Sequence, residues 1–403
     1  MPRVAVTGIG VVCALGRDTG EFAEALFQGR SAIAPIEGID ISKLRFSQGA
    51  QVRGFTHSLH FGDREADFLD RFAQFAVVAA REAVSDAKIE WTSDLKASAA
   101  VITGSCLGGQ NTKDAVFEGL YGRQLGRVSP LTISKVMANA GASHISMDFG
   151  ITGPSYTFST ACSSAGHAIG HAFRTIKNGE APLAIAGGSD APFSWGLLKS
   201  WEAMRVISPD TCRPFSKGRT GMILGEGAAM FVLEPLAAAR ERGARVQAEI
   251  VGFGMSSDAS HITQPSPAGA ALAIRRALRE AGMLPEQVGY INAHGTATVV
   301  NDVCEASAIR DVFGQHTGRI ALSSTKSLHG HALGAAAALE AAATILALRQ
   351  GILPPTANFL GPDPECDLDV IVNESRKQQV EHALSNSFAF GGMNAVLAFR
   401  AAL

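Results

Sequence analysis

FSTACSSAGHAIG, residues 158–170, is the stretch of sequence that says most about the fold. A β-like run leads to Cys162, and a helix of small residues is predicted directly after it, over Ser163–Lys177. A cysteine at such a junction lies at the positive end of the helix dipole, where backbone N–H groups can hold an anion. Both effects lower the pKa of the thiol below its usual value of about 8.5 and so favour the thiolate. The segment alone fits a reactive cysteine and a buried, inert one equally well.

Outside this stretch, short apolar runs alternate with longer helical patterns along the chain, which is typical of α/β architecture. No low-complexity linker and no repeat of roughly 20 to 50 residues is apparent, and the best internal boundary is the polar, glycine-rich segment 210–227. The predicted strands are Val4–Thr7, Ala99–Thr103, Leu183–Ala186, Ala228–Leu233, Ala248–Val251, Tyr290–Ala293, Ala383–Phe388 and Ala395–Phe399. The predicted helices are Phe22–Gln28, Phe72–Ala87, Thr132–Ala142, Ser163–Lys177, Ala270–Ala281, Val303–Phe313 and Gly334–Arg349.

Composition excludes several classes of protein. The 403 residues are 46% hydrophobic and 18% charged, which excludes a disordered chain and fits two to three domains or one large duplicated fold. A net charge of −2 argues against nucleic acid as a partner. The six cysteines are scattered without a CxxC pair, so we expect neither disulfides nor a zinc site, and a reducing, cytoplasmic location.

Four local patterns are better explained by structure than by a separate function. The apolar window 333–353 contains Glu340 and Arg349, which favours a buried helix over a membrane span. TGIGVVC, residues 7–13, begins like a dinucleotide-binding fingerprint but has a cysteine in place of the third glycine. GGSDA, residues 187–191, lacks the closing glycine of a nucleophile elbow. HGH, residues 329–331, has no further motif to complete a metal site, so we expect no metal.

Two histidine-containing turns strengthen the reading of Cys162 as reactive. INAHGTAT, residues 291–298, places His294 just after an apolar strand, in a turn rich in glycine and threonine. SSTKSLHGHALG, residues 323–334, places a lysine and two histidines before a tightly packed helix. Together with Cys162 these turns predict a Cys–His–His site on loops above a sheet, where α/β proteins build their active sites.

The motifs TACSS (160–164), NAHGTAT (292–298), TKSLHGH (325–331) and NSFAFGG (386–392) resemble those of the elongating β-ketoacyl-acyl-carrier-protein synthases of the thiolase superfamily. The resemblance extends from VAVTGIGVV (4–12) through CRPFSKGRTGMILGEGA (212–228) to the C-terminal strand. It implies an α/β, thiolase-like αβαβα fold of five layers and two similar halves. The boundaries we predict are 1–234 for the half with the cysteine and 235–403 for the half with the histidines.

The resemblance also implies roles for individual residues. Cys162 matches the acyl-accepting nucleophile, and His294 and His331 match the histidines that complete the triad. His329 stands where relatives often have threonine, so no catalytic role is assigned to it. The remaining matches are the active-site lysine, Lys326; two acidic positions that could support it, Glu305 and Glu340; the gating Phe390; Thr296 and Thr298, which bind the carrier's pantetheine arm; and Leu107 and Phe388, which face the substrate.

The implied reaction is a decarboxylative Claisen condensation. An acyl group held on Cys162 is joined to malonyl-acyl carrier protein to give 3-oxoacyl-acyl carrier protein, in fatty-acid or polyketide-type elongation. No cofactor is implied beyond the phosphopantetheine of the carrier, and the implied assembly is a homodimer or a heterodimer with a ketosynthase-like partner. The alternatives are the catalytic subunit of a ketosynthase/chain-length-factor pair and a non-catalytic chain-length-factor-like partner. Such partners typically lack the nucleophile, so Cys162 argues against the last.

Departures from the family pattern point to a specialised member. Ala389 stands where relatives usually have glycine and is expected to stiffen the gate loop, and Met393 replaces a common threonine. The bulk of Leu107 is expected to limit the acyl chain. The segment 198–215 and the LHGH variant look closer to nodulation-type and polyene- or aromatic-pathway ketosynthases. Candidates for a basic surface that docks the acidic carrier are Arg123, Arg127, Lys199 and Arg205.

Overall fold

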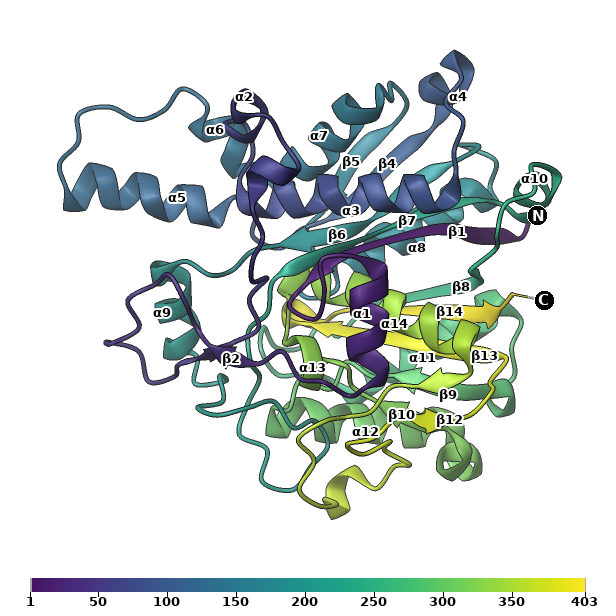
Figure 1. The fold of residues 1–403 in the computed structure, drawn as a ribbon. Helices are drawn as coiled ribbons and strands as arrows, with labels where there is room; N and C mark the ends of the chain where they lie inside the picture. Colours follow the sequence, from purple (N-terminus) through teal and green to yellow (C-terminus); the bar gives the residue numbers. More distant parts are fainter. Residues whose placement is uncertain (1, 403) are drawn as a thin grey trace.

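Ten strands form one large sheet in the computed structural model, which describes residues 2–402 (Figure 1). In chain order they are β1 (Val4–Cys13), β4 (Ala100–Gly104), β5 (Ser155–Phe158), β6 (Ala184–Asp190), β7 (Gly227–Pro235), β8 (Ala248–Ser257), β9 (Val288–Asn292), β10 (Ala321–Ser323), β13 (His382–Ala389) and β14 (Met393–Ala401). Their spatial order is β10-β9-β13-β14-β8-β1-β7-β6-β4-β5. Two further ladders pair β2 (Ala34–Pro35) with β3 (Gln48–Gly49), and β11 (Ile352–Leu353) with β12 (Arg376–Lys377).

The large sheet consists of two similar sets of five strands. In one set β5, β4 and β6 are parallel, and β7 and β1 follow antiparallel. In the other, β10, β9 and β13 are parallel, and β14 and β8 follow antiparallel. The two sets meet where Val4–Val6 of β1 pairs with Ala248–Ile250 of β8. The same order and the same directions therefore occur twice, as expected for two similar halves.

Five helices form the layers that pack against the sheet, and the remaining helices are shorter. Helices α8 (Ser164–Lys177) and α14 (Ala336–Gln350) contact strands of both sets and share one core with them. Helix α3 (Arg71–Ala87) covers the outer face of the first set, and α11 (Pro267–Ala281) and α12 (Val299–Phe313) cover that of the second. The others are α1 (Thr19–Phe27), α2 (Asp63–Ala66), α4 (Ser93–Ser98), α5 (Gln110–Phe117), α6 (Thr132–Val136), α7 (Ala140–Phe149), α9 (Trp195–Ala203), α10 (Leu236–Glu241) and α13 (Lys326–His329). The expected αβαβα arrangement is confirmed.

Helix α14 explains the most apolar window of the sequence. Its residues from Ala336 to Leu348 are buried, alanines supply much of the contact, and the helix lies in the central layer. Across residues 2–402, no helix is both long and apolar enough to cross a membrane. The window is therefore a buried helix, as predicted.

The two glycines of the broken dinucleotide fingerprint pack a helix against a strand. A Cβ at Gly8 would lie 1.9 Å from the carbonyl oxygen of Ala83, and one at Gly10 would lie 1.9 Å from that of Ala79. Helix α3 therefore crosses β1 at a distance that only glycine permits. The second half repeats the device in GFG, residues 252–254 of β8, whose glycines face the carbonyls of Ala277 and Ala273 in α11.

The prediction of one helix over Thr132–Ala142 is wrong. The chain forms α6 and α7 instead, because the turn at Gly108 and Gly109 passes directly over the end of α6. The N–H of Gly109 donates to the carbonyl of Val136, the last residue of α6, at 3.3 Å. A donor from outside the helix thus binds the carbonyl at its end. Sequence reasoning also missed α5, α9 and the short strand β10.

Candidate active site

A tight turn between β5 and α8 holds Cys162. Ala161, just before it, adopts the left-handed φ of 51°, which is unusual for a residue with a side chain. The hydroxyl of Ser164 accepts from the N–H of Thr160 at 2.9 Å and donates to the carbonyl of Ala161 at 2.6 Å. The hydroxyl of Ser163 donates to the carbonyls of Thr160 and Met393, each at 2.8 Å. Cys162 is thus fixed at the start of α8, and its turn is tied to the 390–393 turn of the other half.

The loop after β9 places His294 opposite that turn. Glu305 of α12 is fully buried, and its carboxylate accepts from the N–H groups of His294 at 2.9 Å and Gly295 at 2.8 Å. The side-chain amide of Asn386 donates to the same carboxylate at 3.1 Å. Glu305 therefore holds the backbone of the histidine loop, and its contacts do not include Lys326.

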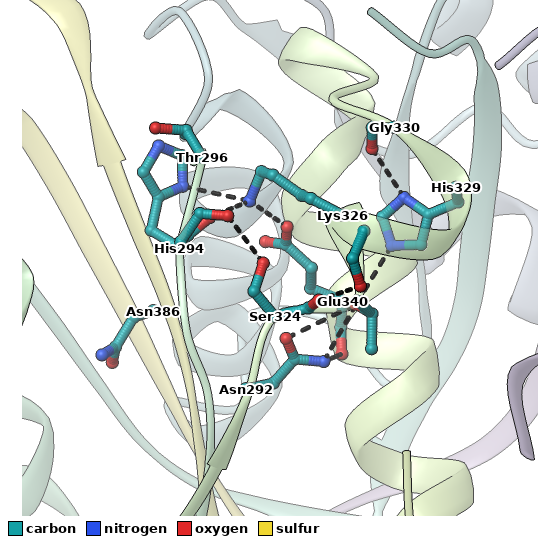
Figure 2. A network of polar contacts seen from close by, with 12 residues as sticks. Asn292, His294, Thr296, Ser324, Lys326, His329, Gly330, Glu340 and Asn386 are labelled. Atoms are coloured by element: carbon teal, nitrogen blue, oxygen red, sulfur yellow. Dashed lines mark hydrogen bonds and ion pairs between the residues drawn. The ribbon is translucent and has the colours of Figure 1, made fainter. Parts of the chain in front are cut away.

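Lys326 lies between His294 and Glu340 with no solvent exposure (Figure 2). Its ammonium group contacts the carboxylate of Glu340, the carbonyl oxygen of His294 at 2.6 Å, and Nδ1 of His294 at 3.2 Å. Because an ammonium group has only donors, Nδ1 of His294 accepts, and the neutral ring carries its proton on Nε2. The sequence left Glu305 and Glu340 open as partners of Lys326, and the structure pairs the lysine with Glu340.

His331 is held through its backbone. Its N–H donates to the carbonyl of Ile223 at 2.7 Å, and its carbonyl accepts from the N–H of Gly225 at 2.9 Å. Its ring lies edge-on to that of His294, with the centroids 5.6 Å apart. Nδ1 of His331 is buried and has no hydrogen-bond partner among residues 2–402. The ring therefore lacks a side-chain partner of the kind that His294 has in Lys326.

His329 lies on the same turn and has both ring nitrogens occupied. Nδ1 donates to the carbonyl of Gly330 at 2.8 Å, and Nε2 accepts from the hydroxyl of Thr325 at 3.0 Å (Figure 2). Two neighbouring residues thus take up both nitrogens, which leaves neither for a metal. No group of three His, Cys, Asp or Glu side chains within 2–402 has the arrangement to hold a metal ion.

A cavity of about 420 Å³ brings most of the expected residues together. Its walls include Cys162, His294 and His331, and also Thr296 and Thr298, whose hydroxyl oxygens are 3.0 Å apart. Three aromatic side chains complete it: Phe388, Phe390 and Trp201. The rings of Phe390 and Trp201 stack with centroids 6.2 Å apart.

The structure differs from what the sequence predicts for Leu107 and Ala389. Leu107 does not line this cavity; it packs behind it in an apolar cluster with Trp201, and its N–H donates to Asp190. Ala389 has a φ of −112°, so the methyl group there imposes no backbone strain, and the left-handed residues of the turn are Gly391 and Gly392.

Among the expected carrier-docking residues, only Arg205 lines the cavity. Arg123 and Lys199 each face a carboxylate of their own, on Glu118 and Glu202.

Burial sets the protonation of the candidate site residues. It raises the pKa of the Cys162 thiol to about 12, and the nearby charge of Lys326 only partly opposes this. Desolvation by burial therefore outweighs the effect of the helix dipole, and the neutral thiol is favoured over the thiolate. Burial, with help from the Lys326 charge, lowers the pKa of His294 and of His331 well below 6.5, so both rings are neutral. Burial also raises the pKa of Glu340 to about 7, against the opposing effect of Lys326.

Sequence reasoning missed two buried carboxylates that shape the site. Asp190, in the GGSDA pattern, accepts from the hydroxyl of Ser105 and from the N–H groups of Cys106, Leu107 and Gly334. Glu226 accepts from Arg71 and from the N–H of Val52. Their signal in the sequence is weak, since each is a lone acidic residue in an apolar, glycine-rich run.

Comparison with known proteins adds independent information. The chain matches the family "Beta-ketoacyl synthase, N-terminal domain" over residues 1–239 and "Beta-ketoacyl synthase, C-terminal domain" over residues 247–360. It is 45% identical over 399 residues to Nodulation protein E of Rhizobium meliloti (strain 1021), covering 99% of each chain. It is 38% identical over 405 residues to 3-oxoacyl-[acyl-carrier-protein] synthase 2 of Staphylococcus aureus (strain COL), covering 99% of this chain and 98% of the other. A solved structure titled "The ishigamide ketosynthase/chain length factor" is 35% identical, with a TM-score of 0.95 and full coverage of both chains.

Proposed function

The chain belongs to the β-ketoacyl synthase family and is a condensing enzyme of the acyltransferase class, and from that premise we propose that Cys162 carries the acyl chain during elongation. The observation that carries the proposal is the shared cavity, which one thiol and two neutral imidazoles line together. Its substrates are an acyl thioester and a malonyl thioester of acyl carrier protein, and its product is a 3-oxoacyl thioester.

In the first half-reaction, the sulfur of Cys162 attacks the acyl carbonyl carbon and the carrier's pantetheine sulfur leaves. The proton of the thiol ends on the departing sulfur, so charge balances. The tetrahedral oxyanion needs preorganised donors, and we assign these to the backbone N–H groups of Cys162 and Phe390, which both border the cavity. The covalent intermediate divides one difficult transfer into two easier ones.

In the second half-reaction, malonyl thioester loses CO₂, and the resulting enolate carbon attacks the acyl group. The sulfur of Cys162 leaves and takes up one proton. A developing enolate oxygen requires donors that do not protonate the carbanion, and the Nε2–H of His294 and the ring of His331 meet this requirement because both are neutral. Lys326 and Glu340 fix the His294 tautomer, and Glu305 holds the His294 loop.

The hydroxyls of Thr296 and Thr298 suit the amides of a pantetheine arm at the mouth of the cavity, and Phe388 and Phe390 border the acyl group. We assign Leu107 to the acyl-binding region behind the cavity, with the apolar cluster that it joins. The phosphopantetheine of the carrier is the only prosthetic group this scheme uses, and a cytoplasmic location suits it.

A second candidate is the catalytic subunit of a heterodimeric ketosynthase/chain-length-factor pair, favoured by the likeness to the ishigamide structure. The presence of Cys162 in the cavity disfavours the third candidate, a non-catalytic partner.

The test is incubation of the purified protein with acyl- and malonyl-carrier protein, followed by mass spectrometry. We expect an acyl adduct on Cys162 and a 3-oxoacyl-carrier product. No product and no adduct with the chain alone would contradict the homodimeric form, and no product after addition of a chain-length-factor partner would contradict the proposal. A panel of acyl chains tests the specialised pathway, which predicts that the enzyme is not confined to short saturated chains.

A further inference from the structure

The two cavity histidines are positioned by different means. His294 is fixed through its ring by Lys326, whereas Nδ1 of the His331 ring has no partner within residues 2–402. The orientation of His331 therefore depends on its backbone, and that backbone is paired to segment 223–225 of the other half of the chain.

Segment 223–225 forms the middle of a three-part ladder. On one side Leu224 bridges His331, and on the other Gly225 bridges Ala50. The N–H of Ala50 donates to the carbonyl of Leu224 at 2.8 Å, and the N–H of Glu226 donates to the carbonyl of Ala50 at 3.2 Å. The packing is tight, since a Cβ at Gly225 would lie 2.5 Å from the carbonyl oxygen of His329. A shift of this segment would therefore be passed directly to His331.

One ion pair anchors the ladder to helix α3. Glu226, with no exposure, accepts from Nε of Arg71 at 3.0 Å and from its Nη2 at 2.7 Å, and from the N–H of Val52 at 2.9 Å. Nη2 of Arg71 also donates to the carbonyl of Val52 at 2.9 Å. The guanidinium lies over the ring of Phe75, 4.7 Å from its centroid. Arg71, the first residue of the long helix α3, thus holds the end of the middle segment at Glu226 and the Ala50 side of the ladder at Val52.

We propose that Arg71 and Glu226 are positioning residues for His331 and so support the decarboxylation half-reaction selectively. The inference rests on the proposed function, in which acyl transfer to Cys162 uses the turn at the start of α8 and decarboxylation uses the two histidines. Neither Arg71 nor Glu226 lines the cavity, so neither touches the substrate. A fixed geometry is what catalysis needs from such residues, because a displacement of about 1 Å can cost about a hundredfold in rate.

The test compares Arg71→Lys with a matched control, Arg242→Lys. Arg242 also holds a buried glutamate, Glu234, through two nitrogens, and its side-chain exposure of 30% matches the 31% of Arg71. That pair lies at the far end of β7, away from the cavity. Both variants lose a bidentate contact, so a general loss of stability affects both alike.

Two rates are measured for each protein: acylation of Cys162 by acyl-carrier protein and release of CO₂ from malonyl-carrier protein. For Arg71→Lys we expect CO₂ release to fall about tenfold or more while acylation stays within about twofold of the wild type. Arg242→Lys should change neither rate. Glu226→Gln keeps an acceptor for Val52 but removes the charge; it should show the same split, and it replaces Arg71→Lys if that variant does not fold.

An equal fall of both rates in Arg71→Lys and Glu226→Gln, or no fall in either, would overturn the positioning role while leaving the proposed function intact. A wild-type protein that neither acylates nor releases CO₂ would overturn the proposed function and the inference with it.

Discussion

At the scale of single residues, the turns next to strands and helices indicate Cys162, His294 and the histidine pair His329 and His331, and the resemblance to a family selects His331 from that pair. Which carboxylate supports Lys326 could not be predicted. Glu305 and Glu340 are both buried and both near the lysine's turn, and only the backbone paths of α12 and α14 decide that Glu340 contacts it. The protonation state of the Cys162 thiol could not be predicted from the sequence either, because it depends on burial, which outweighs the helix dipole.

Replacing Lys326 by methionine should separate the stability of the buried pair from its function. The variant leaves the Glu340 carboxyl buried without its cation, which we expect to cost about 3–5 kcal/mol in the free energy of unfolding. The double variant Lys326→Met/Glu340→Gln should recover most of that stability but not the rate of CO₂ release, because Nδ1 of His294 still lacks its donor. Denaturant unfolding and a decarboxylation assay measure the two effects, and recovery of the wild-type rate by the double variant would contradict the role given to the pair.

His329 should make the protein less stable in acid. Burial lowers the pKa of His329 to about 3 in the folded chain, whereas the unfolded chain binds the proton below about 6.5. Between these two pH values the unfolded state holds more protons than the folded state. The contribution of His329 to stability is therefore complete above about pH 6.5 and declines as the pH falls. His329→Gln keeps a donor for Gly330 and an acceptor for Thr325 but cannot titrate. When the pH falls from 7 to 5, the unfolding free energy of the variant should rise by about 2 kcal/mol relative to that of the wild type. An unchanged difference between the two proteins would refute the assignment.

At the scale of elements, apolar periodicity predicted most of the strands and helices that contribute to the three large cores, with β10 and the start of α7 as exceptions. It failed where tertiary contacts decide. Helix α5 has no buried residue and so leaves no apolar pattern. The break between α6 and α7 arises where the turn at Gly108 and Gly109 packs on the end of α6. This turn lies well before α6 in the sequence, so no local pattern encodes the contact. The GFG pattern of β8 has the same role as the GIG pattern of β1, yet two glycines are too short a signal to indicate a repeat.

Substituting alanine for Gly8 should reveal the close contact of α3 with β1. The new methyl would meet the carbonyl of Ala83 at 1.9 Å, and neither element can shift freely because both are buried. We expect a loss of about 1–3 kcal/mol or more in the free energy of unfolding. Gly318→Ala, where a Cβ meets nothing within 4 Å, is the control and should leave stability nearly unchanged. Equal behaviour of the two variants in thermal unfolding would contradict the packing described.

At the scale of the whole molecule, the site lies where the two halves meet, with the cysteine from one half and the histidines from the other. The duplication is expressed in the order and direction of the strands and not in repeated residues. The sequence could therefore predict it only through the resemblance to a family. The division at residues 234 and 235 stays a prediction. The edge strand β5 has an outer side that pairs with no strand of residues 2–402, and Tyr156 on it is 40% exposed.

That edge favours an assembly of two chains, because uncovered edge strands promote pairing with other chains. Light scattering after gel filtration should give twice the 42.0 kDa of one chain for a homodimer. A particle of one chain's mass that doubles on addition of a ketosynthase-like partner would instead favour the heterodimer, and a single chain under both conditions would contradict either assembly.

The most direct test of the whole account is the division of labour between the halves, measured in Cys162→Ala. The histidines, Lys326 and Glu340 remain in place in this variant, so malonyl-carrier protein should still lose CO₂ while no 3-oxoacyl product forms and no acyl adduct appears. His331→Ala should show the converse, an acyl adduct on Cys162 with CO₂ release lowered by about a hundredfold. Loss of CO₂ release in Cys162→Ala together with loss of the adduct in His331→Ala would contradict the account, because the two half-reactions would then not be divided between the two halves of the fold.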